Sequence, residues 1–117
     1  MKTHYMRLNA RPFEELKSGE KTVEVRLNDE KRQKLRIGDK IEFLKRPDLA
    51  EKLLVEVVEL ISCKTFGELY DLLGERHFRN WNREDFISST YVNYYPKEKE
   101  EKYGALGIRI QVLESKK

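Results

Sequence analysis

The sequence of 117 residues has one cysteine, two histidines and three prolines. A single cysteine excludes an internal disulfide and a zinc site built from several thiolates. Cys63 ends an apolar run, which favours a buried and inert thiol. His4 and His77 lie far apart in the sequence and have no acidic pattern beside them. The sequence therefore predicts neither a metal site nor a cofactor.

Long apolar segments are also missing. No run approaches the roughly 18 apolar residues of a membrane span, and residues 1–7 contain no apolar signal core. We therefore expect a cytoplasmic protein with no membrane partner. Several catalytic motifs are absent too: a glycine-rich phosphate loop, His-Glu-x-x-His, Cys-x-x-Cys and a serine in a nucleophile elbow.

Charged residues, by contrast, are abundant, at 38% of the chain, where about a quarter is usual. The 24 Lys and Arg residues nearly balance the 21 Asp and Glu residues, so the net charge is only +3. Such a balance supports a polyanionic partner only if the cations cluster in space. An abundance of Lys and Glu is also typical of thermophilic proteins.

Hydrophobic patterns and turn residues predict one α+β domain over residues 1–117. Strands are expected at His4–Asn9, Thr22–Leu27, Lys40–Leu44, Leu53–Cys63 and Leu106–Val112. Helices are expected from Pro12 to Gly19, from Thr65 to Gly74 and from Asn82 to Tyr94. Thr65 and Glu68 form a capping box at the start of the second of these. A further charged turn is expected over 97–102. Residues 114–117 are expected to form a frayed tail. Because regular helices do not separate the strands, we expect a small, mixed and mostly antiparallel barrel with three to four peripheral helices.

The strand at Thr22–Leu27 alternates strictly between apolar and polar residues, a pattern typical of a strand with one buried face. Its polar side chains are Thr22, Glu24 and Arg26, and Lys21 stands at its entry. On a solvated sheet face these charges would form an ordinary ion pair worth ~0–1 kcal/mol. In a cleft, Arg26 could bind phosphate or a base edge. Glu24 could accept a hydrogen bond from an exocyclic amine, and Lys21 could neutralise phosphate or act as a base.

Two further clusters are open to two interpretations each. Five cations fall within eleven residues, at Arg26, Lys31, Arg32, Lys34 and Arg36. They form either a footprint for a nucleic-acid backbone or a solvated turn offset by neighbouring acids. Five aromatic residues, Phe78, Trp81, Tyr91, Tyr94 and Tyr95, either stack bases or pack the core. Trp81 and Tyr94 are the two whose exposure would favour stacking.

Residues Gly19–Arg26 resemble the Gly-x-Lys-x-x-Glu-x-Arg motif of the ASCH domain family. Neighbouring segments also resemble family features, namely Pro12–Gly19, Asp29–Arg32, Gly38–Asp39, Thr65–Tyr70 and Tyr94–Gly104. The likeness spans nearly the whole chain and is strongest to small single-domain prokaryotic members. It implies a PUA-like β-barrel, similar to domains that bind RNA, in which the motif lines a cleft.

The resemblance favours binding of RNA or a nucleotide-like ligand beside the Thr22–Arg26 strand. In this hypothesis Arg26, Lys31 and Arg32 contact phosphate and Glu24 reads a polar edge. The full set of expected binding residues is Lys21, Thr22, Glu24, Arg26, Lys31, Arg32, Trp81 and Tyr94.

One bacterial branch of the family is an acetylcytidine amidohydrolase that uses a lysine, a threonine and a glutamate. Lys21 matches its lysine, but Glu24 stands where that enzyme has its threonine nucleophile. The alternative hypothesis is therefore an amidohydrolase acting on a modified nucleoside. Lys21 would be its base, Glu24 its acid or base, and Thr22 at most a replacement nucleophile. A third hypothesis is a regulatory or protein-binding module with a vestigial cleft. The sequence does not indicate an oligomeric state.

Overall fold

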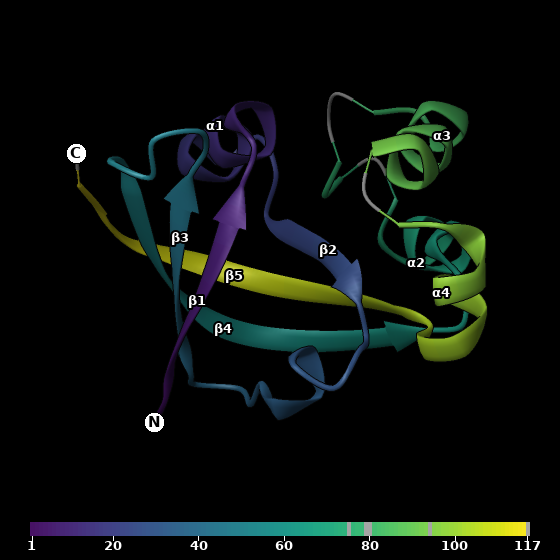
Figure 1. The fold of residues 1–117 in the computed structure, drawn as a ribbon, viewed down its shortest axis with the longest axis horizontal. Helices are drawn as coiled ribbons and strands as arrows, with labels where there is room; N and C mark the ends of the chain where they lie inside the picture. The colour runs from purple at the N-terminus through teal and green to yellow at the C-terminus, as the bar shows by residue number, and fades with distance from the viewer. Residues whose placement is uncertain (75, 79–80, 94, 117) are drawn as a thin grey trace.

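The computed structural model describes residues 1–74, 76–78, 81–93 and 95–116, with Asn93 described by its backbone alone. Within these residues the predicted α+β class is confirmed (Figure 1). The strands are β1 (Thr3–Leu8), β2 (Val23–Leu27), β3 (Lys40–Lys45), β4 (Lys52–Cys63) and β5 (Ala105–Lys116). The helices are α1 (Ala10–Ser18), α2 (Phe66–Leu73), α3 (Arg83–Asn93) and α4 (Lys97–Tyr103), with the short 3₁₀ helix η1 (Arg32–Lys34) between β2 and β3. None of the described helices has the length and apolar character needed to cross a membrane.

The strands form one mixed sheet in the order β1-β3-β4-β5-β2. β1 and β3 are parallel and the other neighbouring pairs are antiparallel, as predicted. Hydrogen bonding between strands does not close this sheet into a barrel, because β1 and β2 are its two edges. A side chain spans the gap instead: Arg26 Nη2 donates to the carbonyl oxygen of Arg7 over 2.9 Å.

Helix α1, which connects these two edges along the chain, begins two residues earlier than predicted. Pro12 occupies the third position of its first turn, where a backbone N–H has no partner within the helix in any case. The first backbone bond runs from Phe13 N–H to the carbonyl of Asn9. Gly19 ends the helix with a φ of 84°, as expected of a left-handed cap residue.

Strand β5 is longer than predicted, and the expectation of a frayed tail over 114–117 is wrong for the residues described. Glu114, Ser115 and Lys116 pair with the first residues of β4. Their polar side chains show no strand pattern, so only the partner strand reveals their conformation. Lys117 lies outside the described residues.

The buried apolar residues form two clusters. The first lies among β1, α1, β3, β4 and β5, and includes Phe13, Phe43 and Ile108. The second lies among β2, α2 and α3, and includes Phe66, Phe78 and Phe86. Figure 1 shows α2, α3 and α4 gathered at one end of the long β4–β5 pair, away from α1. The pocket described next is lined by residues of both α1 and α3.

Candidate functional site

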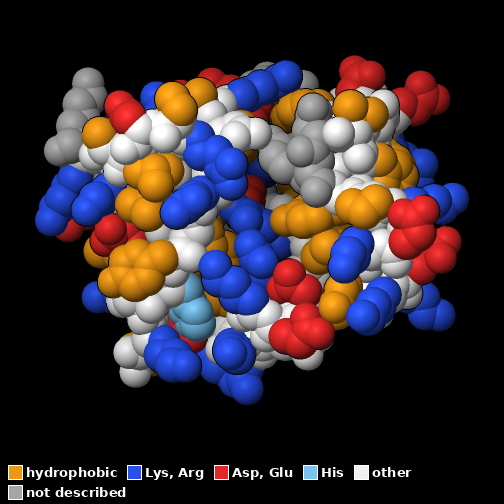
Figure 2. All heavy atoms as spheres, viewed as in Figure 1, with side chains coloured by type: hydrophobic (Ala, Val, Ile, Leu, Met, Phe, Trp, Pro, Cys, Tyr) orange, Lys and Arg blue, Asp and Glu red, His pale blue; other side chains and the backbone are white. Residues whose placement is uncertain are grey.

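A pocket of about 640 Å³ lies between the two apolar clusters. Its wall includes Leu8 from the first cluster and Phe78 and Phe86 from the second. Figure 2 shows Lys and Arg side chains gathered around a hollow at the centre of this face. The charged residues of the wall are Arg7, Arg11, Lys21, Arg26, Arg32 and Arg46, together with Glu15 and Glu24.

Glu24, on β2, is the buried centre of the charged wall, with 3% of its surface exposed. Lys21 Nζ lies 3.2 Å from its Oε1, and Arg26 Nε donates to its Oε2 over 2.7 Å. Burial raises the pKa of Glu24, but the charges of Lys21 and Arg26 outweigh it, and the net pKa is below the ordinary value. Glu24 is therefore an ionised carboxylate at neutral pH, shared by two cations.

The Lys21–Glu24–Arg26 group is not a solvated ion pair, so the interpretation of this strand as open sheet surface is wrong. The side chains of Lys21, Glu24 and Arg26 are 13%, 4% and 11% exposed. Charges this far from water are costly unless each is well paired. The sequence alone does not reveal this burial, because the same alternation occurs on solvated strands.

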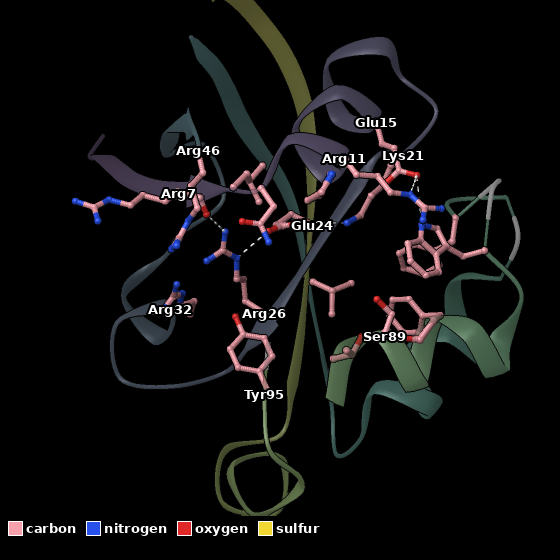
Figure 3. Close-up of a pocket in the computed structure, with 18 residues that line it drawn as sticks. Arg7, Arg11, Glu15, Lys21, Glu24, Arg26, Arg32, Arg46, Ser89 and Tyr95 are labelled. Carbon is pink, nitrogen blue, oxygen red and sulfur yellow. Dashed lines mark hydrogen bonds and ion pairs between the residues drawn. The ribbon is translucent and has the colours of Figure 1, made fainter. Parts of the chain in front are cut away.

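Arg26 and Tyr95 form the next part of the wall, and Figure 3 shows the Tyr95 hydroxyl pointing toward Arg26. Burial lowers the pKa of Arg26, but Glu24 and Tyr95 raise it by more, so the guanidinium stays charged. Burial raises the pKa of Tyr95. At neutral pH the pocket therefore presents a charged guanidinium beside a neutral phenol.

Arg32 reaches the pocket from η1. Its Nη1 lies 3.1 Å from Asp29 Oδ2, and its side chain is 15% exposed. Its Nε is buried and has no hydrogen-bond partner in the part of the chain that the structure describes. A buried N–H without a partner is uncommon in folded proteins.

Trp81 and its neighbours form the opposite side of the pocket. The guanidinium of Arg11 lies 4.1 Å from the centre of the Trp81 ring. Trp81 Nε1 donates to Glu15 Oε2 over 3.3 Å, and Arg11 Nε lies 3.7 Å from the same oxygen. Glu15 is buried on α1, so this contact fixes the indole against the helix.

A family model for the ASCH domain matches residues 6–114. The chain belongs to the ASCH domain family. ASCH domains have a PUA-like fold and are generally linked to RNA binding. No curated protein matches the chain.

Three solved structures resemble this ASCH domain over nearly its whole length. The crystal structure of hypothetical protein PH0355 is 29% identical, with a TM-score of 0.81 over 95% of this chain and 99% of that one. Protein PF0455 from Pyrococcus furiosus is 31% identical, with a TM-score of 0.71 over 96% and 98%. The S128A mutant of ZmASCH from Zymomonas mobilis is 13% identical, with a TM-score of 0.56 over 94% and 68%. This last likeness concerns the fold alone.

Five of the predicted site residues of this ASCH domain line the pocket: Lys21, Glu24, Arg26, Arg32 and Trp81. Thr22 does not line it. Its hydroxyl lies 2.8 Å from His77 Nδ1, because the regular strand begins only at Val23 and Lys21, rather than Thr22, turns into the pocket. Lys31 is exposed outside the wall, and its Nζ donates to the carbonyl of Tyr5 over 3.2 Å. Tyr94 lies outside the described residues.

Sequence reasoning missed Arg7, Arg11, Glu15 and Arg46 as pocket residues of this ASCH domain. The parallel pairing of β1 with β3 sets Leu8 opposite Lys45, which brings Arg7 and Arg46 to the same end of the two strands. No local pattern marks either arginine. Glu15 had a weak signal, because it lies between the buried Phe13 and Leu16 on α1. No group of three or more His, Cys, Asp or Glu side chains could hold a metal ion within the residues that the structure describes.

Proposed function

We propose that this ASCH domain binds single-stranded RNA, with part of the RNA held in the pocket beside β2. The observation that carries the proposal is the combination of charge and aromatic surface in one pocket. Six cations and two carboxylates line it, together with Phe78, Trp81, Phe86 and Tyr95. Single-stranded nucleic acids are bound by such a combination, because cations neutralise phosphates and flat rings stack on bases.

The distribution of charge supports the proposal more strongly than the total charge does. Six cations against two carboxylates leave an excess of four positive charges around the pocket, while the whole chain carries a net +3. The cations therefore cluster where a ligand can reach them. A concave, positively charged surface also concentrates an anionic ligand from solution.

Individual residues then take distinct roles. Arg26 and Arg32 contact phosphate, since each is a guanidinium in the wall of the pocket. Glu24 holds Lys21 and Arg26 in place and retains lone pairs for an amino group of a base. Trp81 supplies a rigid ring. Lys31 stands outside the wall and adds only long-range attraction.

Fluorescence anisotropy with a labelled single-stranded RNA at low salt tests the proposal. Arg26→Ala and Arg32→Ala are each expected to weaken binding about tenfold and to reduce the slope of log affinity against log salt by about 1. Arg36→Ala is the matched control, because Arg36 belongs to the same basic segment but is exposed and outside the pocket. If neither pocket variant weakens binding at low salt, the proposal is wrong.

A hydrolase of a modified nucleoside draws support from one observation, the contact between Lys21 Nζ and Glu24 in the pocket. Its weakness is the nucleophile, because the Thr22 hydroxyl is bonded to His77 outside the pocket wall. Incubation with acetylcytidine discriminates the two functions. Deacetylation that disappears in Lys21→Ala favours the hydrolase, whereas no turnover at high protein concentration contradicts it.

A further inference from the structure

The two ends of the pocket differ in chemistry. Figure 3 shows Arg7, Arg32 and Arg46 around Arg26 at one end, called the arginine end below. Arg11, Glu15 and Lys21 lie toward the other end, where Phe78, Trp81 and Phe86 also line the wall. This second region is called the aromatic end.

The arginine end has positive charge and hydrogen-bond donors that the described residues leave unused. Arg7 and Arg46 are exposed and form no ion pair with any residue that the structure describes. Arg32 also lines this end, and its Nη1 is paired with Asp29. Guanidinium groups match the oxygens of a phosphate group with two hydrogen bonds each. A phosphate group would therefore suit this end.

At the aromatic end, the Glu15 carboxylate and the Trp81 N–H are already paired with each other. Glu15 is buried and accepts from Trp81 Nε1, and Arg11 covers the Trp81 ring. The rest of the lining at this end comes from Phe78, Trp81 and Phe86, which present apolar ring atoms to the pocket. Such a surface suits a nucleobase, which buries its ring faces by stacking.

The volume of the pocket indicates how much of an RNA chain it can enclose. A volume of about 640 Å³ falls in the range of pockets that enclose small molecules. A second hollow of about 540 Å³ adjoins the arginine end and shares Arg7, Asn9 and Arg46 with the first. A chain that continues from a bound phosphate therefore has room beyond these two arginines.

We infer that the pocket takes one nucleotide in a fixed orientation, with its phosphate at the arginine end and its base at the aromatic end. The inference rests on the proposed function and adds the size and the direction of the ligand. The remainder of an RNA chain then leaves past Arg7 and Arg46.

Isothermal titration calorimetry of the full chain tests this orientation, with the four nucleoside 5′-monophosphates and their four nucleosides as probes. At least one monophosphate is expected to bind about tenfold more tightly than its nucleoside. The double variant Arg7→Ala/Arg46→Ala is expected to remove most of this preference. Because both side chains are exposed and unpaired in the described structure, the variant should fold, and circular dichroism verifies this.

The matched control is Lys40→Ala/Lys64→Ala, which removes two exposed charges that lie outside the pocket and should leave the preference unchanged. The orientation is overturned if monophosphates and nucleosides bind equally, or if the arginine double variant keeps the preference. Failure of every monophosphate to bind, while RNA still binds in an Arg26-dependent manner, overturns this inference and leaves the proposed function standing. If neither the monophosphates nor RNA bind, both this inference and the proposed function are wrong.

Trp81 provides a second measurement, because it is the one tryptophan of the sequence. A bound base should change its fluorescence, whereas inorganic phosphate alone should compete with the nucleotide without that change. An equal fluorescence change with inorganic phosphate would contradict the proposed orientation.

Discussion

Glu24 and Glu100 are two carboxylates with the same burial and opposite surroundings. Each has 3% of its surface exposed. Glu24 is held by two cations, Lys21 and Arg26. Glu100, on α4, accepts from the backbone N–H of Phe66 over 2.8 Å and from the Tyr91 hydroxyl over 2.7 Å, and both donors are uncharged.

The difference distinguishes a carboxylate that joins helices from one that lies in the wall of the pocket. Glu100 joins α4 to α3 and to the first turn of α2, where a negative charge interacts favourably with the helix N-terminus. It lies outside the pocket wall. Glu24 instead neutralises only half of the charge that surrounds it, and the remaining positive charge faces the pocket. In this protein the carboxylate matched by neutral donors joins three helices, and the one outnumbered by cations lies in the wall of the pocket.

Glu24→Ala should have the largest effect on stability. It leaves Lys21 and Arg26 buried beside each other without a counter-charge, and breaking a buried pair in this way costs about 3–5 kcal/mol. Urea unfolding measures the loss, and RNA affinity should fall as well because Arg26 loses its support. A loss below about 1 kcal/mol would mean that the group behaves as a solvated pair.

Glu100→Ala should be less costly, at about 1–3 kcal/mol, because it leaves two neutral donors unmatched rather than two charges. The same urea titration measures it. RNA affinity should equal that of the native protein at temperatures where both are folded. A folded Glu100→Ala protein that no longer binds RNA would contradict the placement of Glu100 outside the binding site.

The Lys21–Glu24–Arg26 group and the Tyr91–Glu100 pair should also weaken at opposite ends of the pH scale. The folded-state pKa of Glu24 is below its ordinary value of 4.5, so its stabilisation is complete above that pH and is lost as the pH falls below it. Burial and the bond to Glu100 raise the pKa of Tyr91 from 10.0 to about 12. Its contribution is therefore complete below pH 10 and is lost as the pH rises toward 12.

Unfolding free energies measured across the pH range test this contrast with two conservative variants. Glu24→Gln should flatten the acid side of the curve alone, and Tyr91→Phe should flatten the alkaline side alone. If Tyr91→Phe changes the acid side instead, the assignment of the acid loss to Glu24 and of the alkaline loss to Tyr91 is wrong.

Thr22→Val should have the smallest effect on stability, because it removes one neutral hydrogen bond, to His77. This bond involves neither Glu24 nor Glu100. The expected loss is about 0.5–1.5 kcal/mol, with RNA affinity unchanged. Thermal unfolding and the anisotropy assay measure the two quantities. A variant that loses acetylcytidine turnover but keeps its stability would revive Thr22 as a nucleophile.

The sequence predicted the fold well where a local pattern determines structure. The alternation around Val23, Val25 and Leu27 marked β2, and Gly19 marked the end of α1. The same logic failed at Glu114–Lys116, whose strand conformation depends on pairing with β4. It also failed to show that β1 and β2 remain unpaired edges, because closure depends on the whole sheet.

The site was predictable only in its local part. Lys21, Glu24 and Arg26 stand within six residues of one another, so the motif made them visible. Arg7 and Arg46 are 39 positions apart and meet only through the parallel pairing of β1 and β3. Thr22 shows the limit of alternation, because the pattern holds only from the first residue of the regular strand onward.

The contacts at the outer edge of β1 also bear on aggregation. An edge strand with free carbonyl groups can recruit a strand from another molecule and start aggregation. On β1, two alternate carbonyls at this edge, those of Tyr5 and Arg7, are occupied by Lys31 Nζ and Arg26 Nη2. Lys31 and Arg26 therefore occupy carbonyl groups that intermolecular strand pairing would use. We expect the solubility of the folded protein to depend in part on these two residues, which the sequence suggested for RNA binding.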